Sequence, residues 1–196
     1  MEKDFKLDSF PLSKTKKAKG SRRLVREKAL QILVAFDISA TELDFLYEHI
    51  FFREFQFEDA IPPEGKLLRP AEIIELEADT PIDWKDSEID FGRNLINQIV
   101  SNKNEFEVLI AEFTKNWEVD RIATIDKYLL MIAITELLYF PEIPTKVSLD
   151  EAIDISKKYS TEKSSMFING VLDAILIKLT EEGRIRKTGK GLLDNK

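Results

Sequence analysis

Apolar residues recur every three or four positions along most of the 196-residue chain, which is the spacing of an amphipathic helix. The first such segment covers residues 22–39, and Ser21 in front of it is a suitable N-cap. Its apolar face consists of Val25, Ala29, Ile32, Leu33 and Phe36. Thr41, followed by Asp44, predicts the capped start of a second helix over residues 43–55.

The helical pattern stops after Phe57 and resumes at Ser87. The stretch between them, about residues 57–86, holds four prolines and many acids, which predicts a long acidic loop. Three helical segments follow, over residues 87–100, 105–117 and 120–140. The last is so apolar that we expect it to be the central helix of the core.

Pro141 and Pro144 end this central segment. Ser148 and Glu151 then match a capping box, which predicts that the next helix covers residues 152–159. A last helix is expected from about Thr161 to Glu182, with Gly183 as its C′ residue. With no strand-type alternation, the pattern predicts an all-α fold, a compact bundle of about seven helices. Residues 21–182 form this domain, between a flexible basic arm at residues 1–20 and a basic C-terminal tail at residues 183–196.

The net charge of −7 is unevenly distributed along the chain. From Lys14 to Lys28 there are eight basic residues and one acid, a local charge of about +7. From Thr41 to Asp90 there are fifteen acids and four bases, a local charge of about −11. The tail is basic again, through Arg184, Arg186, Lys187 and Lys190. A polarised chain of this kind leaves nucleic-acid binding open.

Residue types that carry chemistry are scarce in this chain. There is no cysteine, and the single histidine, His49, has no second histidine with which to share a metal ion. Neither a Walker-type loop nor a G-x-G-x-x-G motif is present. We therefore expect no enzyme activity, no metal and no cofactor. The chain also lacks a secretory leader and an apolar run of about 20 residues, so we expect a cytoplasmic protein that does not enter a membrane.

The start of the first helix carries three arginines, Arg22, Arg23 and Arg26. Cations at a helix N-terminus oppose the helix dipole, at a cost of about 0.3–1 kcal/mol each when exposed. A phosphate backbone would reverse the sign of that cost and would release counterions. The alternative is a solvated basic terminus that only aids solubility.

Several motifs of this sequence resemble the NusB family of transcription antitermination factors. Residues 22–31, from Arg22 to Gln31, look like the Arg-rich first helix of that family. Residues 143–153, IPTKVSLDEAI, resemble its proline–lysine–valine segment, and residues 167–173, FINGVLD, are similar to its next motif. Residues 132–137 match the helix before the proline loop. Together the resemblance covers the first helix and everything from about residue 120 to residue 179.

The resemblance implies an all-α fold of two packed helical subdomains. It also implies binding to boxA single-stranded RNA of ribosomal RNA transcripts, together with the ribosomal protein NusE. Such a complex helps RNA polymerase to read through terminators as part of an antitermination assembly. Members of the family differ in self-association, so a homodimer stays open.

Carried across to this chain, the resemblance gives eight RNA-binding candidates. Arg22, Arg23 and Arg26 would contact phosphates beside Gln31, Phe167 would stack on a base, and Asn169 would contact a base edge. The flanking charges are Lys146 and Lys163. Phe167 could instead be a core residue, and Asn169 with Gly170 could instead mark close helix packing. Met166 stands where many relatives have a basic residue.

The NusE-binding candidates are Asp126, Lys127 and Glu136, of which the first two could equally form a solvated turn. Two other functions remain as alternatives. One is a protein-interaction adaptor that does not bind RNA specifically. The other is the RNA-targeting domain of a ribosomal RNA methyltransferase, which would require that this chain be a fragment, because it has no glycine-rich cofactor loop.

Overall fold

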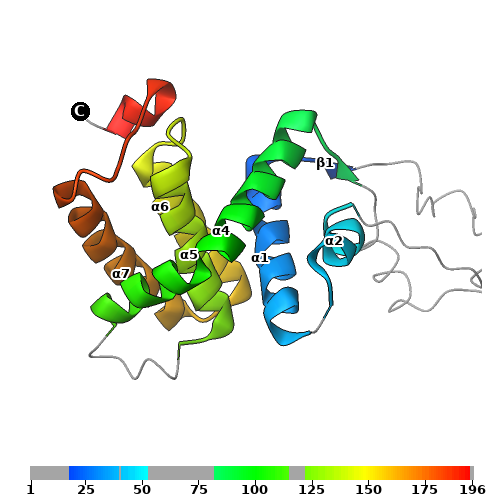
Figure 1. The fold of residues 1–196 in the computed structure, drawn as a ribbon, viewed down its shortest axis with the longest axis horizontal. Helices are drawn as coiled ribbons and strands as arrows, with labels where there is room; N and C mark the ends of the chain where they lie inside the picture. Colours follow the sequence, from blue (N-terminus) through cyan, green and yellow to red (C-terminus); the bar gives the residue numbers. More distant parts are fainter. Residues whose placement is uncertain (1–17, 40, 53–81, 115–121, 195–196) are drawn as a thin grey trace, which may run out of the picture.

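The computed structural model describes residues 18–39, 41–52, 82–114 and 122–194 (Figure 1). These residues form six α-helices, which confirms the all-α prediction of a bundle of about seven. The helices are α1 (Arg22–Ile38), α2 (Leu43–Leu46), α4 (Asp86–Phe113), α5 (Thr124–Tyr139), α6 (Thr145–Tyr159) and α7 (Glu162–Glu181). A π-helix, η2 (Tyr47–Phe52), continues α2, and a 3-10 helix, η4 (Gly189–Asp194), lies near the C-terminus. Most of the predicted basic arm and acidic loop lies outside the described residues.

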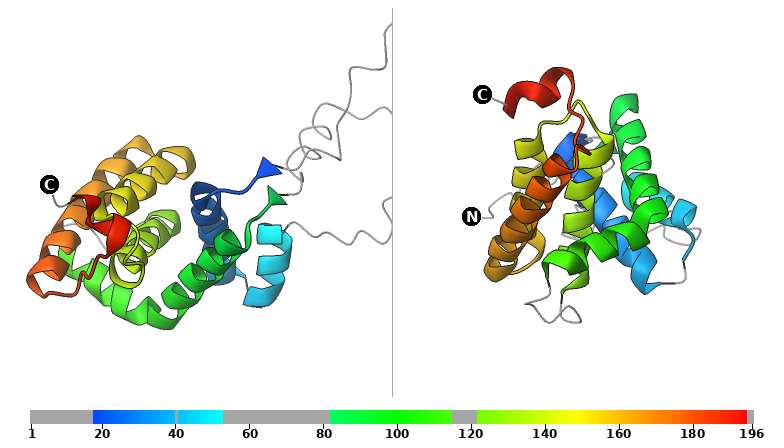
Figure 2. Two further views of the ribbon diagram at one scale, coloured as in Figure 1. Left: turned by 90° about the horizontal axis from the view of Figure 1, so that it is seen from above. Right: turned by 60° about the vertical axis from the view of Figure 1, so that its left-hand side comes forward.

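The helices are arranged in two groups that α4 connects (Figure 1). One group contains α1 and α2, the other contains α5, α6 and α7, and α4 packs against members of both. Two short strands, β1 (Ala18–Lys19) and β2 (Ile82–Asp83), pair in parallel beside the N-terminal end of α1 (Figure 2). None of the helices in the described ranges is both long and apolar enough to cross a membrane.

Helix α5 lies at the centre of the core, as its composition predicts. It packs against α1, α4, α6 and α7. Every residue from Tyr128 to Leu137 is buried, on all sides of the helix. A helix that is apolar around its circumference must bury that surface, and this position does so.

Helix α4 differs from the prediction of two separate segments over residues 87–100 and 105–117. It is one helix of 28 residues that ends at Phe113. The apolar pattern is interrupted at residues 101–104, Ser-Asn-Lys-Asn, and the described contacts of Asn102 and Lys103 are polar. Asn102 Nδ2 donates to the Gln98 carbonyl (2.7 Å), and Lys103 Nζ pairs with Asp37 (2.5 Å). A polar turn whose side chains form such bonds is compatible with an uninterrupted helix.

Two of the predicted helix ends are confirmed. Ser21 caps α1, since its Oγ accepts a hydrogen bond from the Leu24 amide (3.1 Å). Gly183 follows α7 with φ of 65°, and the amides of Gly183 and Arg184 donate to the carbonyls of Thr180 (3.0 Å) and Leu179 (2.9 Å). This pair of bonds is a Schellman motif, which needs the left-handed backbone that glycine adopts without strain.

Two other predicted caps are wrong. Helix α2 begins at Leu43 after Glu42, so Thr41 is not its N-cap. Helix α6 begins at Thr145, directly after Pro144, and Ser148 lies within its first turns, where its hydroxyl donates to the Pro144 carbonyl (3.4 Å). Pro144 can stand before a helix but cannot lie inside one, so the helix starts at once behind it.

The C-terminal tail docks on the turn between α5 and α6. Lys187 Nζ donates to the carbonyls of Glu136 (2.8 Å) and Phe140 (3.1 Å), which lie at the C-terminal end of α5. The Thr188 amide donates to the Pro141 carbonyl (2.9 Å). Gly191 is buried against that same carbonyl, and a Cβ there would collide with its oxygen. The tail therefore has a defined position up to η4.

Candidate nucleic-acid interface

Two arginines at the start of α1 are exposed, and both are ion-paired. Arg22 is 42% exposed, its Nη1 lies 3.5 Å from Glu142, and its guanidinium stacks 4.3 Å from the centre of the Phe91 ring. Arg23 is 49% exposed and contacts two carboxylates of α6, Glu151 (3.1 Å) and Asp154 (2.8 Å). These hydrogen bonds raise the pKa of Arg23, so its charge is fixed.

The third arginine, Arg26, lies in the interior. Its side chain is 4% exposed, and its Nε and Nη2 donate to the two carboxylate oxygens of Glu136 on α5, at 2.5 and 3.0 Å. The Glu136 side chain is completely buried. Arg26 and Glu136 thus bind each other and join α1 to α5. The sequence predicts RNA as the partner of Arg26 and NusE as the partner of Glu136. Their burial points to a structural role for both.

Gln31 lies in a polar seam between α1 and α6. One turn before it, Glu27 is buried and accepts hydrogen bonds from Lys158 Nζ (2.5 Å) and from the Tyr159 hydroxyl (2.8 Å). Gln31 Nε2 donates to the same hydroxyl (3.4 Å). The bond to Glu27 raises the pKa of Lys158, and burial raises the pKa of Tyr159. Arg23, Glu27 and Gln31 recur every fourth residue and therefore share one face of α1.

Lys146 and Asn169 line a groove of about 520 Å³ between α6, α7 and the tail. Asn169 Nδ2 donates to Asp173 (3.2 Å) in this groove. The other lining residues are Thr145, Leu149, Asp150, Leu176 and Leu193. Asp150 of the groove lies one turn before Asp154 on α6, so the groove adjoins the carboxylates that bind Arg23.

Phe167 lies on the other side of α7 from Asn169, because two residues along a helix correspond to a turn of about 200°. It lines a second hollow, of about 260 Å³, with Phe113, Met166, Gly170 and Val171. Among the described residues, nothing lies within 4 Å of a Cβ built on Gly170. No described helix therefore packs closely against this glycine. Lys163, near the N-terminal end of α7, is exposed. The structure thus does not gather the eight candidates at one point.

The proposed partner residues Asp126 and Lys127 lie at the opposite end of α1 from Arg22. Lys127 pairs with Glu107 (3.2 Å) and lies 3.9 Å from Asp37, whose pKa is lowered mainly by its bond to Lys103. Asp126 is 5% exposed, and its Oδ1 has no hydrogen-bond partner within the described part of the chain.

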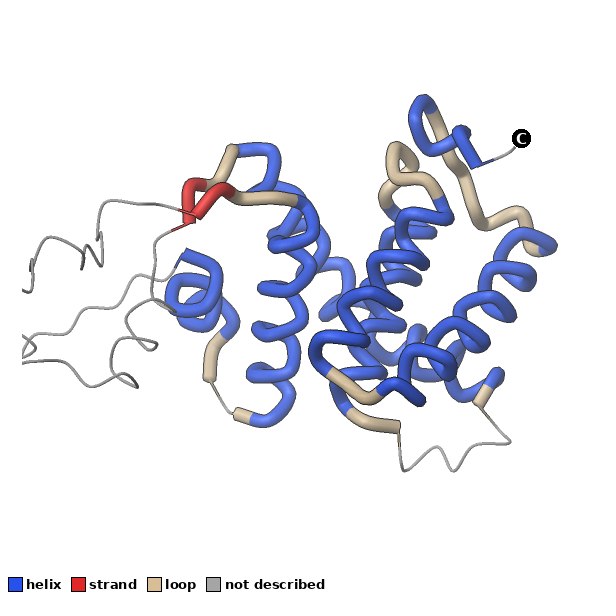
Figure 3. Tube along the Cα trace, turned by 180° about the vertical axis from the view of Figure 1, so that it is seen from behind, coloured by secondary structure: helices blue, strands red, loops and turns tan. Residues whose placement is uncertain are grey.

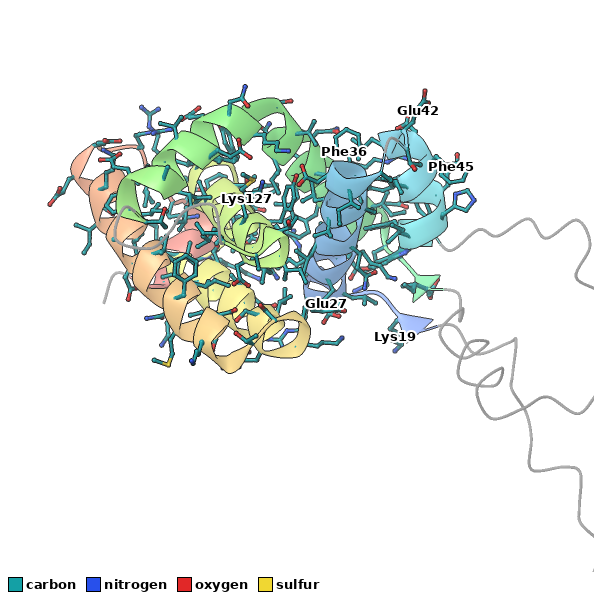
Figure 4. The ribbon with its side chains drawn as sticks, turned by 90° about the horizontal axis from the view of Figure 1, so that it is seen from below. Lys19, Glu27, Phe36, Glu42, Phe45 and Lys127 are labelled. Atoms are coloured by element: carbon teal, nitrogen blue, oxygen red, sulfur yellow. The ribbon has the colours of Figure 1, made fainter. Side chains whose placement is uncertain are left out.

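Two exposed aromatic residues at this same end were not expected from the sequence. Phe36, predicted on the apolar face of α1, is 37% exposed, and Phe45 on α2 is 53% exposed. They project beside Glu42 (Figure 4), and Asp44 and Glu48 are exposed nearby along the chain. The acids that flank both aromatic residues in the sequence were a signal that this end of the apolar face meets solvent.

Comparisons with known proteins give one consistent family. The family model described as "NusB family" matches residues 23–176. A transcription antitermination protein NusB of Salinibacter ruber is 49% identical over 113 residues, 58% of this chain and 71% of the relative. The protein of the same name from Chloroherpeton thalassium is 37% identical over 174 residues, 89% of this chain and 70% of the relative.

Solved structures agree with these matches. A structure of T. maritima NusB has a TM-score of 0.60 at 26% identity. The match covers 82% of this chain and 93% of the T. maritima chain. A structure of the antitermination factors NusB and NusE in complex with dsRNA has a TM-score of 0.56 at 22% identity. The match covers 80% of this chain and 96% of the chain in that structure. The second similarity bears on the fold alone.

Proposed function

The chain belongs to the NusB family, and on that premise we propose that it binds boxA-type single-stranded RNA of ribosomal RNA transcripts together with NusE. In this role it promotes read-through by RNA polymerase in the cytoplasm, without catalysis and without a cofactor. Its relatives carry the name of transcription antitermination proteins, and one structural neighbour was solved with NusE and RNA.

The observation that carries the proposal is the geometry of Arg22 and Arg23. Both are about half exposed, and Arg23 holds two carboxylates through different guanidinium nitrogens. A phosphate group offers oxygen atoms that suit the same fork of donors. Exposed ion pairs are worth only about 0–1 kcal/mol, so RNA phosphates can replace the carboxylates at small cost. Arg26 supports this surface from beneath and does not need to touch RNA.

The remaining candidates define separate contact points along an RNA strand. Lys146 and Asn169 face the groove, where a lysine suits a phosphate and an amide suits a base edge. Phe167 faces the other hollow, where it could pack against an unpaired base. Because the two sides of α7 are involved, different nucleotides must contact Asn169 and Phe167. Lys163 and Gln31 would flank these points.

NusE is proposed to bind at the opposite end of α1. Lys127 lies there, and Phe36 and Phe45 add exposed apolar area beside acids, while the buried Asp126 lies beneath this surface. This surface suits a partner that presents basic groups around an apolar patch. Glu136 is buried in its pair with Arg26, so it would support NusE binding only by stabilising the fold.

The test measures binding of a boxA-type single-stranded RNA, with and without NusE, at several salt concentrations. The variant is Arg22→Ala with Arg23→Ala, and the matched control is Lys178→Ala with Arg184→Ala, which removes two partly exposed, ion-paired cations on the α4–α7 side. Loss of two phosphate contacts predicts that the slope of log affinity against log salt becomes shallower by about 1.4. NusE is expected to tighten wild-type binding.

If wild type and the arginine variant bind RNA equally weakly, with or without NusE, the basic helix start is only a solvated terminus. The protein would then be an interaction adaptor, which is the second candidate. The exposed aromatic residues at the far end of α1 are the observation that favours this candidate.

A further inference from the structure

The C-terminal segment from Arg184 to Asp194 lies beyond the residues that match the family model, which end at residue 176. It is nevertheless docked on the body of the protein. Lys187 binds the last carbonyls of α5, Thr188 binds Pro141, and Gly191 lies tightly against the same turn. A segment held by these contacts places its side chains at defined positions.

The four cations of this segment have two kinds of environment: two of them bind other groups within the described part of the protein, and two do not. Lys187 is used to bind the α5 carbonyls, and Arg184 pairs with Glu105 (2.6 Å). Arg186 and Lys190 are exposed, and neither forms an ion pair with any residue that the structure describes. This segment therefore presents two uncompensated positive charges.

These two charges are presented beside the proposed RNA surface. The tail binds Pro141, and the next residue of that turn, Glu142, is the ion-pair partner of Arg22. On its other side, the tail closes the groove of Lys146 and Asn169 through Leu193. Seen from behind, η4, the α5–α6 turn and the N-terminal end of α1 lie along the upper edge of the molecule, with the turn between the other two (Figure 3).

We propose that the docked C-terminal segment is a second phosphate-binding element, in which Arg186 and Lys190 contact the backbone of the RNA strand between Arg22 and the groove. This inference rests on the proposed function. Asp150 and Asp173 repel phosphates from their part of the groove wall, which leaves Lys146 and the rim formed by the tail as the sides open to the RNA backbone. A cation without an intramolecular partner gains the full benefit of counterion release, whereas Arg23 must first give up two carboxylates.

The main experiment compares four proteins in a salt titration with a boxA-type single-stranded RNA. They are wild type, Arg186→Ser with Lys190→Ser, Arg22→Ala with Arg23→Ala, and a control that combines Lys178→Ser with Arg184→Ser. The control removes the same charge, but its cations pair with α4 carboxylates on another side of α7. For the Arg186 and Lys190 variant we expect a salt slope shallower by about 1.4 and roughly 10- to 25-fold weaker binding near 0.1 M salt.

A further variant separates the position of the charges from their number. Gly191→Ala keeps all four cations, but its Cβ collides with the Pro141 carbonyl oxygen and displaces the segment. We expect it to weaken RNA binding although its net charge is unchanged. Because Arg186 and Lys190 are exposed, their serine variant is expected to unfold at the same temperature as wild type.

The outcomes distinguish this inference from the proposed function. If the Arg22 and Arg23 variant weakens binding while the Arg186 and Lys190 variant matches the control, the tail is not part of the site and the proposed function stands. If neither variant changes the salt slope, the proposed function and this inference both fail. If Gly191→Ala binds RNA as tightly as wild type, the docked position has no role and the inference is overturned.

Discussion

Arg23 and Arg26 are three residues apart on one helix, yet they lie in opposite environments. Arg23 lies at the surface between α1 and α6, where it binds two partly exposed carboxylates. Arg26 points inward and forms a buried pair with Glu136 of α5. The proposed function gives the two arginines different purposes: the outer ion pairs would be exchanged for RNA phosphates, and the inner pair holds the helix that presents them. Glu151 contacts both arginines, at 3.1 Å from Arg23 and 3.6 Å from Arg26.

The strongest test of this contrast removes one member of the inner pair. Glu136→Ala leaves the buried Arg26 guanidinium with only its longer contact to Glu151 (3.6 Å), which is expected to cost up to about 3–5 kcal/mol of unfolding free energy. Replacing both residues with apolar ones, Arg26→Met with Glu136→Leu, should recover most of that loss. Urea unfolding measures both variants. A loss of less than about 1 kcal/mol in Glu136→Ala would show that the pair is not as buried as the structure indicates.

The outer pair should respond in the opposite way. Glu151→Gln with Asp154→Asn frees Arg23 and removes two negative charges beside it. We expect RNA affinity to rise several-fold at low salt, while each exposed pair with Arg23 accounts for no more than about 1 kcal/mol of unfolding free energy. The Glu151 change also removes a contact to the buried Arg26 (3.6 Å), so Asp154→Asn alone gives the cleaner comparison of stability. Equilibrium binding and urea unfolding of the same preparations check this. Unchanged or weaker RNA binding would mean that Arg23 makes no phosphate contact.

A glycine on the exposed side of α7 sharpens the distinction between folding and binding. Gly170→Ala adds a methyl group where the described residues leave open space, so the helix should gain about 0.5–1 kcal/mol. If RNA approaches α7 closely at this point, the same change should weaken RNA binding. Thermal unfolding and RNA titration report the two effects separately. A lowered melting temperature would contradict the open environment of Gly170.

The smallest effect concerns pH. Hydrogen bonding to Lys103 holds the pKa of Asp37 below its ordinary value of 3.8. A carboxyl whose pKa is depressed in the folded state contributes stability that is present above its unfolded pKa and lost as pH falls through the folded one. Asp37→Asn should therefore reduce the loss of stability below about pH 4. Unfolding midpoints measured between neutral pH and about pH 2.5 test this, and parallel curves for the two proteins would contradict it.

Most of the fold could be predicted from apolar spacing, because helices that bury one face must carry that pattern. Helices α1, α5 and α7 follow it closely. The continuity of α4 could not be predicted, since residues 101–104 look like a break when the polar partners of Asn102 and Lys103 are unknown. The start of α6 differs from the prediction because the capping-box pattern at Ser148 and Glu151 is not used as a cap, and the helix starts directly behind Pro144.

The division of the candidate site was harder to predict. Spacing places Arg26 within one turn of Arg22, but spacing alone does not say which side of α1 faces α5. One signal was available: Glu136 is the only charged residue between Tyr128 and Tyr139, in a helix that is apolar all round. A lone acid in such a helix needs a buried cation, and Arg26 lies next to the buried Val25. The separation of Phe167 from Asn169 followed from helix geometry and could have been predicted.

The buried Arg26–Glu136 pair also restricts how this sequence can change over time. A single substitution at either position passes through a protein with an unpaired buried charge, which takes a large share of a typical stability of 5–15 kcal/mol. The two positions, 110 residues apart in the chain, should therefore be inherited as a unit. Among descendants of a common ancestor, we expect Arg26 and Glu136 to be replaced together or retained together, and that correlation would identify the inner pair without any structure.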